Sequence, residues 1–191
     1  MSNFYIADWH YGHANIIKYD NRPFFSVDEM NERLIANWNE QVGERDLVYS
    51  LGDMFWGAVD KAVPILRQLN GKKILIRGNH DRTGRPEFDS YFDLITDYLE
   101  IFDEDFKQNI VLCHYPIPCF NGHHHGWYHL YGHVHNSFEW NMMEHFRDEM
   151  DALYEKPCNM INVGAMMPWM DYSPRVFGNI VLDYERWRKT R

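Results

Sequence analysis

Residues 73–81 read KILIRGNHD, an aliphatic run that stops at a glycine and is followed by Asn, His and Asp. An apolar run of this length predicts a buried strand, and the glycine after it predicts a tight turn. Short apolar runs recur along the chain and predict further strands at 3–7, 46–51, 98–102, 109–113, 128–131, 160–163 and 179–184. Helical patterns lie between them, one opened by the capping-box pair Ser26 and Glu29. This alternation predicts an α/β fold.

Polar side chains that can bind metal follow five of these predicted strands directly. They are Asp8 and His10, Asp53, Asn79 and His80, His114, and His133 and His135. Carboxylate, imidazole and carboxamide groups are ligands for hard to borderline divalent ions. Glycines at 52, 78 and 132 precede several of them and permit tight or left-handed turns. Each residue alone would be an ordinary turn former or a hydrogen-bonded histidine. Because ligands bind at the carboxyl ends of strands in α/β folds, the joint pattern predicts a metal site.

The order of these motifs closely resembles that of the calcineurin-like metallophosphoesterase superfamily: Asp8-x-His10, Gly52-Asp53, Gly78-Asn79-His80-Asp81, His114 and Gly132-His133-x-His135. The longer opening at 7–17, ADWHYGHANII, is similar to a small bacterial and phage branch of that superfamily. The resemblance implies a four-layer α/β/β/α sandwich with a dinuclear site at one sheet edge. It also implies phosphoester hydrolysis by a hydroxide shared between two divalent ions, for which manganese, iron and zinc all suit the ligands.

The family's ligand roles carry over to this sequence without a substitution. The resemblance implies two sets of ligands, one for each metal: Asp8, His10 and His135 for the first, and Asn79, His114 and His133 for the second. Asp53 would bridge both ions, and His80 matches the family's catalytic histidine that binds no metal. The residues after Gly52-Asp53 are MFWG and lack the Asp-Arg-Gly continuation of the protein serine/threonine phosphatases. This departure disfavours a phosphoprotein substrate.

The leaving group must be protonated or stabilised as the ester bond breaks. His80 is predicted to donate that proton, because histidine titrates near neutral pH. Asp81 is predicted to orient His80, with a structural role in the turn as the alternative. His13, Arg82 and His125 are candidate substrate contacts. A structural alternative stays open for each of the three: helix-end packing for His13, surface solvation for Arg82 and a solvated loop for His125.

The composition of the 191-residue chain limits its partners. A formal net charge of −9 argues against sequence-independent binding to nucleic-acid backbones. No apolar stretch approaches the roughly 20 residues that a membrane helix needs, and the start lacks a signal-peptide pattern. Three cysteines without a CxxC pair suggest neither a disulfide framework nor a thiolate zinc site. We therefore expect a cytoplasmic protein that acts on a small phosphate ester.

The predicted organisation is a single metallophosphoesterase domain over 1–191, in which 136–159 forms an insertion or a lid. The predicted function is hydrolysis of a phosphodiester or phosphomonoester of a small, nucleotide-like substrate. Two alternatives stay open: a nuclease that acts on short or single-stranded ends, and a binding scaffold that keeps the fold without turnover. The complete ligand set and the presence of His80 favour the enzyme.

Overall fold

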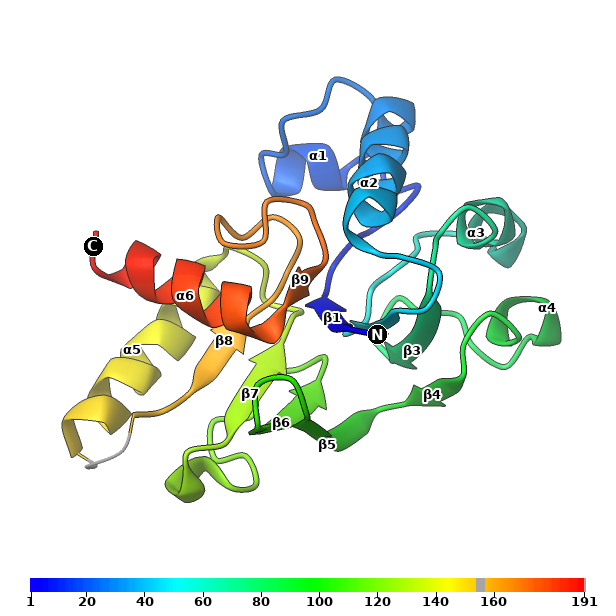
Figure 1. Cartoon of the computed structure of the whole chain (residues 1–191). Helices are drawn as coiled ribbons and strands as arrows, with labels where there is room; N and C mark the ends of the chain where they lie inside the picture. Colours follow the sequence, from blue (N-terminus) through cyan, green and yellow to red (C-terminus); the bar gives the residue numbers. More distant parts are fainter. Residues whose placement is uncertain (154–156, 191) are drawn as a thin grey trace.

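The computed structural model describes residues 1–153 and 157–190, and within them nine strands form two sheets (Figure 1). The first sheet has the order β4-β3-β2-β1-β9, from β1 (Asn3–Ile6), β2 (Leu47–Ser50), β3 (Lys72–Ile76), β4 (Leu94–Thr96) and β9 (Arg175–Val176). The second has the order β5-β6-β7-β8, from β5 (Tyr98–Asp103), β6 (Gln108–Cys113), β7 (Tyr128–Tyr131) and β8 (Met160–Asn162). The prediction of a mixed α/β fold is confirmed.

Parallel pairing brings the carboxyl ends of the central strands to shared edges. In the first sheet, β1 to β4 are parallel and only β9 is antiparallel. In the second sheet, β6, β7 and β8 are parallel and β5 is antiparallel. An isolated parallel bridge pairs Ala7 with Gly164, just beyond the ends of β1 and β8. The two sheets therefore meet at their carboxyl-terminal edges, where loops from both converge.

The described helices are α1 (Ile16–Tyr19), α2 (Val27–Gln41), α3 (Val59–Leu66), α4 (Pro86–Asp89), α5 (Phe138–Leu153) and α6 (Phe177–Arg188), with a short 3-10 turn, η1 (His123–His125). At the start of α2 the Ser26 hydroxyl accepts the Glu29 N–H at 3.1 Å, as the predicted capping box requires. The Glu29 carboxylate accepts the Phe25 N–H at 2.7 Å in place of the Ser26 N–H. In Figure 1, α2 and α3 lie beside the first sheet, and α5 and α6 lie on the side of the second. None of the helices in these residues is both long and apolar enough to span a membrane.

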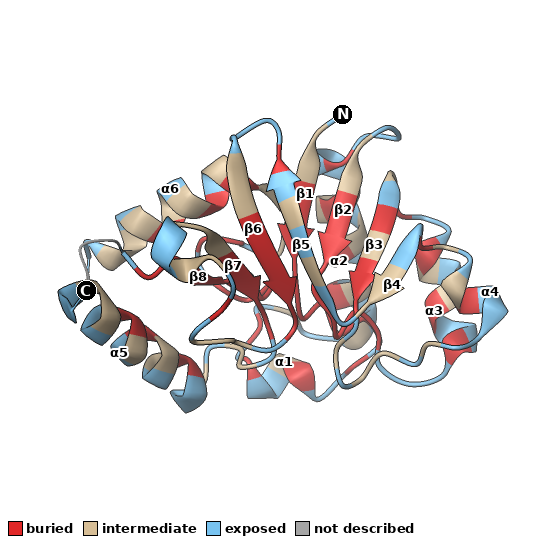
Figure 2. Cartoon of the chain, turned by 90° about the horizontal axis from the view of Figure 1, so that it is seen from below, coloured by how far each residue is buried: buried red, intermediate tan, exposed pale blue. Residues whose placement is uncertain are grey.

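One face of α2 forms the core beneath the first sheet. Met30, Leu34 and Trp38 recur every four residues, and all three are fully buried. The Trp38 ring packs on that of Trp9 with centroids 5.4 Å apart. Figure 2 shows buried residues concentrated on the central strands, with intermediate and exposed residues on the edge strands β4 and β5. Truncating Leu34 to Ala would cost about 2–5 kcal/mol of stability, because the cavity could not collapse fully.

The prediction of a strand at 179–184 is wrong, because this segment lies within helix α6. Its buried residues, Phe177, Ile180 and Tyr184, are spaced by three and four positions, which places them on one helical face. The segment 136–159 contains α5, whose Trp140 and Arg147 are buried. Residues 154–156 of that predicted insertion or lid lie outside the described part of the chain.

Candidate metal centre

Two groups of potential metal ligands lie where the sheets meet. The structure brings Asp8, His10 and His135 together in one group, and Asp53, His114 and His133 in the other. Within each group the ligand atoms all lie within 4.8 Å of one another. The residues come from the loops after β1, β2, β6 and β7, so parallel strand ends deliver them to one place as the sequence indicates.

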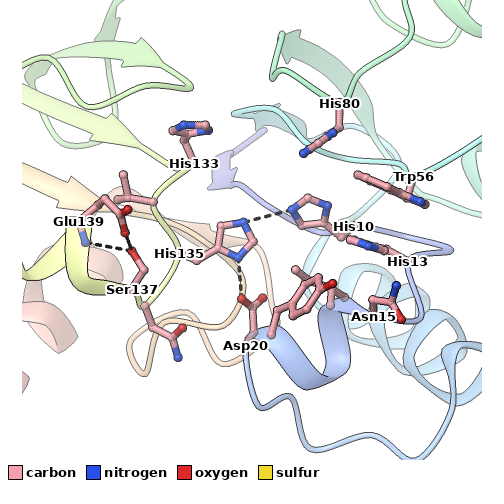
Figure 3. A pocket seen from close by; sticks show the side chains of 14 residues that line it. His10, His13, Asn15, Asp20, Trp56, His80, His133, His135, Ser137 and Glu139 are labelled. Carbon is pink, nitrogen blue, oxygen red and sulfur yellow. Dashed lines mark hydrogen bonds and ion pairs between the residues drawn. The ribbon is translucent and has the colours of Figure 1, made fainter.

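The first group holds facing ring nitrogens beside a buried carboxylate. Nε2 of His10 lies 3.2 Å from Nε2 of His135, as Figure 3 shows. Oδ1 of Asp8 lies 3.8 Å from the same His135 nitrogen. Burial lowers the pKa of His10, and neighbouring His135 lowers it further. Burial raises the pKa of Asp8. A cation between these atoms would lower both pKa values, because it favours a neutral imidazole with a free lone pair and an ionised carboxylate. It would therefore reinforce the shift at His10 and oppose the shift at Asp8.

The second group shows the same convergence of electron pairs. The His114 ring donates from Nδ1 to the Leu51 carbonyl at 2.8 Å, which leaves Nε2 as an acceptor. That Nε2 faces Oδ1 of Asn79 at 3.2 Å and Oδ2 of Asp53 at 3.6 Å. Three acceptors directed at one another repel unless a proton or a cation lies between them. The donor set therefore fits a divalent metal ion, which nitrogen and oxygen ligands of this kind bind.

Asp53 lies between the two groups. Its Oδ1 accepts the backbone N–H of His80 at 2.9 Å, which leaves Oδ2 for other partners. Oδ2 lies 3.7 Å from Nε2 of His10 in the first group and 3.6 Å from Nε2 of His114 in the second. One carboxylate oxygen of Asp53 therefore faces both groups of ligands at once.

The ligand loops adopt backbone conformations that side chains usually avoid. Positive φ angles occur at Asp8 (55°), His10 (53°), Asp53 (51°), His133 (70°) and His135 (47°). Residues in this region cost of order 1–3 kcal/mol each and cluster at functional sites. The sequence indicated such turns at the preceding glycines, but of those three only Gly52 has a positive φ. Gly132 is needed for space instead, because a Cβ there would lie 2.6 Å from the Asp8 carboxylate.

Two residues outside every predicted motif, Asp20 and Arg22, support the first group. Asp20 accepts a 2.7 Å hydrogen bond from Nδ1 of His135, which turns Nε2 of that ring toward Asp8 and His10. Arg22 donates to the Asp20 carboxylate at 2.9 Å, and to the backbone carbonyls of Asp8 and Trp9 at 2.8 Å each. Both side chains are buried. A carboxylate behind a metal-binding histidine fixes its tautomer and orientation.

His80 borders both groups from the cleft side. Its Nε2 lies 3.8 Å from Oδ2 of Asp53, and its side chain is 38% exposed. The ring also lies 4.6 Å from that of Trp56, which in turn stacks on His13 at 3.9 Å with nearly parallel planes. Figure 3 shows this cluster across the cleft from His133. His80 therefore lies beside both ligand groups without belonging to either, and His13 lines the same cleft.

The Asp81 carboxylate is engaged by backbone amides. It accepts the N–H groups of Gly78 at 2.8 Å, Asp53 at 2.9 Å and Met54 at 3.0 Å. These bonds tie the loop after β3 to the loop after β2. The structure therefore supports the turn role for Asp81, and its oxygens are directed at amides instead of at the His80 ring.

The other two candidate substrate contacts do not line the cleft beside the ligand groups. Arg82 is exposed and lines a second, small cavity whose wall also includes His80 and Phe88, so its role as a substrate contact stays a prediction. His125 lies in η1, ahead of β7, whereas the metal ligands follow that strand. The Gly126 carbonyl next to it accepts a hydrogen bond from Gln108, the first residue of β6. The loop therefore lies at the opposite end of the second sheet from His114.

A cleft of about 640 Å³ opens from the ligand groups toward α1 and the start of α5. Its walls combine the histidines of the centre with a mixed polar and apolar surface. The lining residues outside the histidines are Asn15, Ile16, Tyr19, Asp20, Trp56, Val134, Asn136, Ser137 and Glu139. A volume of this size accommodates a small organic molecule beside the metal ligands.

Comparisons with known proteins agree with this geometry. The family model of the calcineurin-like phosphoesterases matches residues 4–183. An uncharacterised protein of Methanocaldococcus jannaschii is 53% identical over 81 residues, 41% of this chain and 46% of that protein. The Gene 66 protein of Mycobacterium phage D29 is 31% identical over 132 residues, 61% of this chain and 65% of that protein. The chain thus aligns with less than two thirds of the length of these curated relatives. A crystal structure of a protein of unknown function from Aquifex aeolicus superposes with a TM-score of 0.71 at 27% identity, covering 95% of this chain and 98% of that one.

Proposed function

The chain belongs to the calcineurin-like phosphoesterase family, and we propose that it uses two divalent metal ions to hydrolyse a phosphoester of a small, nucleotide-like molecule. The observation that carries this proposal is the position of Asp53. Its Oδ2 faces one ring nitrogen from each ligand group, at 3.7 Å and 3.6 Å. A carboxylate placed in this way suits a bridge between two cations, and isolated structural metal sites do not need one.

When bound, two divalent cations would neutralise phosphoryl oxygens and lower the pKa of an attacking water molecule. The chain's own residues position the substrate and supply the proton that the leaving group takes up. His80 can donate from Nε2 to the leaving oxygen, because the ring is partly exposed to the cleft and close to Asp53. Trp56 and His13 form a stacked pair of rings beside His80, which limits the orientations that the His80 ring can adopt.

Manganese, iron and zinc all suit the donor set of imidazole, carboxylate and carboxamide groups. We propose a reducing cytoplasmic location, which suits three cysteines that form no disulfide with one another: Cys113, Cys119 and Cys158. We also propose that the partner is a small phosphate ester. The acidic chain offers little support for binding to a nucleic-acid backbone.

The test of this proposal is turnover by chelator-stripped protein to which manganese, zinc or iron is restored singly. Bis(p-nitrophenyl) phosphate and p-nitrophenyl phosphate serve as substrates. We expect metal-restored hydrolysis that Asp53→Asn abolishes and that His80→Ala reduces about 10²–10⁴-fold in kcat. His145→Ala, at an exposed histidine on α5, is the matched control and should keep wild-type turnover. Metal binding without hydrolysis of either ester would favour a binding scaffold instead.

A further inference from the structure

We propose that the substrate is a phosphodiester with a single negative charge, whose second organic group is uncharged and lies in the cleft against Tyr19 and Trp56. This inference rests on the proposed dinuclear hydrolysis and names its substrate class. It follows from the charges that line the cleft and from the room beside the metal ligands.

Among the described residues, the cleft offers neither Lys nor Arg to a second negative charge. The guanidinium nearest to the first ligand group, that of Arg22, is buried and donates to Asp20 and to two backbone carbonyls. Arg82 does not line this cleft, although the smaller cavity that it lines shares His80 with it. A phosphate in the cleft would therefore depend on the metal ions and, at the leaving oxygen, on the proton of His80 for charge compensation.

The charge balance of the centre then matches a diester. Two divalent cations would carry four positive charges, and the carboxylates of Asp8 and Asp53 would cancel two of them. One of the remaining two compensates the deprotonated nucleophile, and the other compensates one anionic phosphoryl oxygen. A phosphomonoester dianion would bring a further negative charge that no Lys or Arg of the described cleft lining offsets.

The rim of the cleft adds repulsion against anionic groups. Glu139 lines it at the start of α5, and its carboxylate accepts the Ser137 hydroxyl at 2.6 Å. Asp20 also lines the cleft, but its charge is paired with Arg22 at 2.8 Å. A substrate with several phosphates, such as a nucleoside triphosphate or an oligonucleotide, would direct additional negative charge toward Glu139. Like charges in contact disfavour binding, and this provides selectivity against such ligands.

The opposite wall suits a flat or apolar group. The Tyr19 side chain is 73% exposed and the Trp56 side chain 40% exposed, and Ile16 lies beside them in the lining. Exposed aromatic rings at a cleft can stack on an aryl group or a nucleobase. This wall begins next to His80, through the 4.6 Å contact between its ring and that of Trp56. The second ester group would thus lie beside the residue that protonates the leaving oxygen.

The test uses metal-loaded full-length protein and three substrates with the same leaving group: phenyl p-nitrophenyl phosphate, ethyl p-nitrophenyl phosphate and p-nitrophenyl phosphate. We expect kcat/KM to fall in that order, by at least tenfold from the phenyl diester to the monoester. Tyr19→Ala should raise KM for the phenyl diester and leave the ethyl diester within about twofold. Glu139→Lys should reduce the ratio of kcat/KM between the phenyl diester and the monoester about fivefold. Glu149→Lys, at an exposed position on the same helix, should leave this ratio unchanged.

Calorimetry compares the binding affinity of a diester with that of a monoester without turnover, with diphenyl phosphate and phenyl phosphate as probes. We expect diphenyl phosphate to bind at least tenfold more tightly. Equal kcat/KM values for the three esters, or tighter binding of phenyl phosphate, would overturn the inference while the proposed hydrolysis stands. Metal-loaded protein that hydrolyses none of the three esters would overturn both.

Discussion

The carboxylate of Asp20 accepts a 2.7 Å hydrogen bond from Nδ1 of His135, although the two residues lie 115 positions apart in the chain. Burial opposes a charge on the His135 ring, but Asp8 and Asp20 outweigh it and raise the pKa of that ring. The same contact directs Nε2 toward Asp8 and His10. The orientation of one proposed metal ligand therefore depends on a residue from the loop after α1.

Replacing Asp20 by Asn should weaken one of the two proposed metal sites. The amide can keep a hydrogen bond to His135, but it loses the charge that favours a strongly donating ring. We expect about a 10–100-fold loss of affinity at one site and an unchanged second site. Competition with a chromophoric chelator measures both constants. Asp171→Asn, at an exposed position with φ of 47°, is the matched control. Unchanged affinity at both sites in Asp20→Asn would contradict this role.

Replacing Arg22 by Gln should destabilise the metal-free protein. The substitution leaves the Asp20 charge buried and removes the donors to the carbonyls of Asp8 and Trp9. Removing one partner of a buried ion pair typically costs about 3–5 kcal/mol. Urea unfolding of chelator-treated protein measures the loss, and Arg33→Gln on the exposed face of α2 should change stability by less than about 0.5 kcal/mol. A loss below about 1 kcal/mol in the free energy of unfolding for Arg22→Gln would contradict a stabilising role for the Arg22–Asp20 ion pair.

Asp81→Asn separates the structural role of this residue from a catalytic one. The amide group of Asn can accept hydrogen bonds only through one oxygen, so at least one of the three backbone donors loses its partner. We expect a loss of about 1–3 kcal/mol in the free energy of unfolding. The midpoint of the pH profile of kcat should stay at its wild-type value, because the carboxylate does not contact the His80 ring. A shifted midpoint with unchanged stability would instead support the orientation of His80 by Asp81.

His129 should make the protein acid-sensitive in a defined pH range. Burial lowers its pKa from 6.5 to about 4, and its Nε2 must stay unprotonated because it accepts the Ile117 N–H at 3.1 Å. Between pH 6.5 and pH 4 the unfolded chain binds the proton more tightly than the folded chain. The free energy of unfolding should therefore fall by about 3 kcal/mol as the pH drops through this range. Above pH 6.5 the neutral His129 should make its full contribution to stability.

His129→Gln tests this prediction by difference. The Gln side chain can replace an acceptor and a donor but does not titrate, so the stability gap between wild type and variant should change by about 3 kcal/mol between pH 7 and pH 4. Measuring the gap instead of the absolute stability cancels the titration of the metal ligands. His145→Gln, at an exposed histidine on α5, is the matched control for the substitution itself. A gap that does not vary with pH would contradict a buried, neutral His129.

The positions of the ligand residues could be predicted because parallel strands end at a common edge. Asp8, Asp53 and His114 each follow a strand directly, so their convergence needs only the topology. The support from Asp20 and Arg22 could not be predicted. They lie in an irregular segment, and their partners are fixed only when the chain has folded. The positive φ angles of the candidate ligand residues could not be predicted either, because glycine is the residue expected to adopt such angles.

The helix α6 shows where periodicity is ambiguous. The run at 179–182, NIVL, is short and apolar, and such a run fits a buried strand or a buried helix segment equally well. Tertiary packing decides for the helix, since Phe177, Ile180 and Tyr184 all face the core. The position of His125 could not be predicted from its distance in sequence to a candidate ligand. His125 is near His133 in sequence, but the intervening strand β7 carries the chain from one end of the sheet to the other.

The central claim is that Asp53 joins two metal ions in one centre, and manganese titration followed by electron paramagnetic resonance tests it most directly. Metal-stripped protein receives Mn²⁺ up to two equivalents while hydrolysis of bis(p-nitrophenyl) phosphate is recorded on the same samples. We expect the six-line signal of isolated Mn²⁺ to give way to a broad, spin-coupled signal as the second equivalent binds, together with the rise in activity. Asp53→Asn should show isolated ions and no turnover. Two equivalents that keep the isolated signal in the wild type, or no binding at all, would contradict the account.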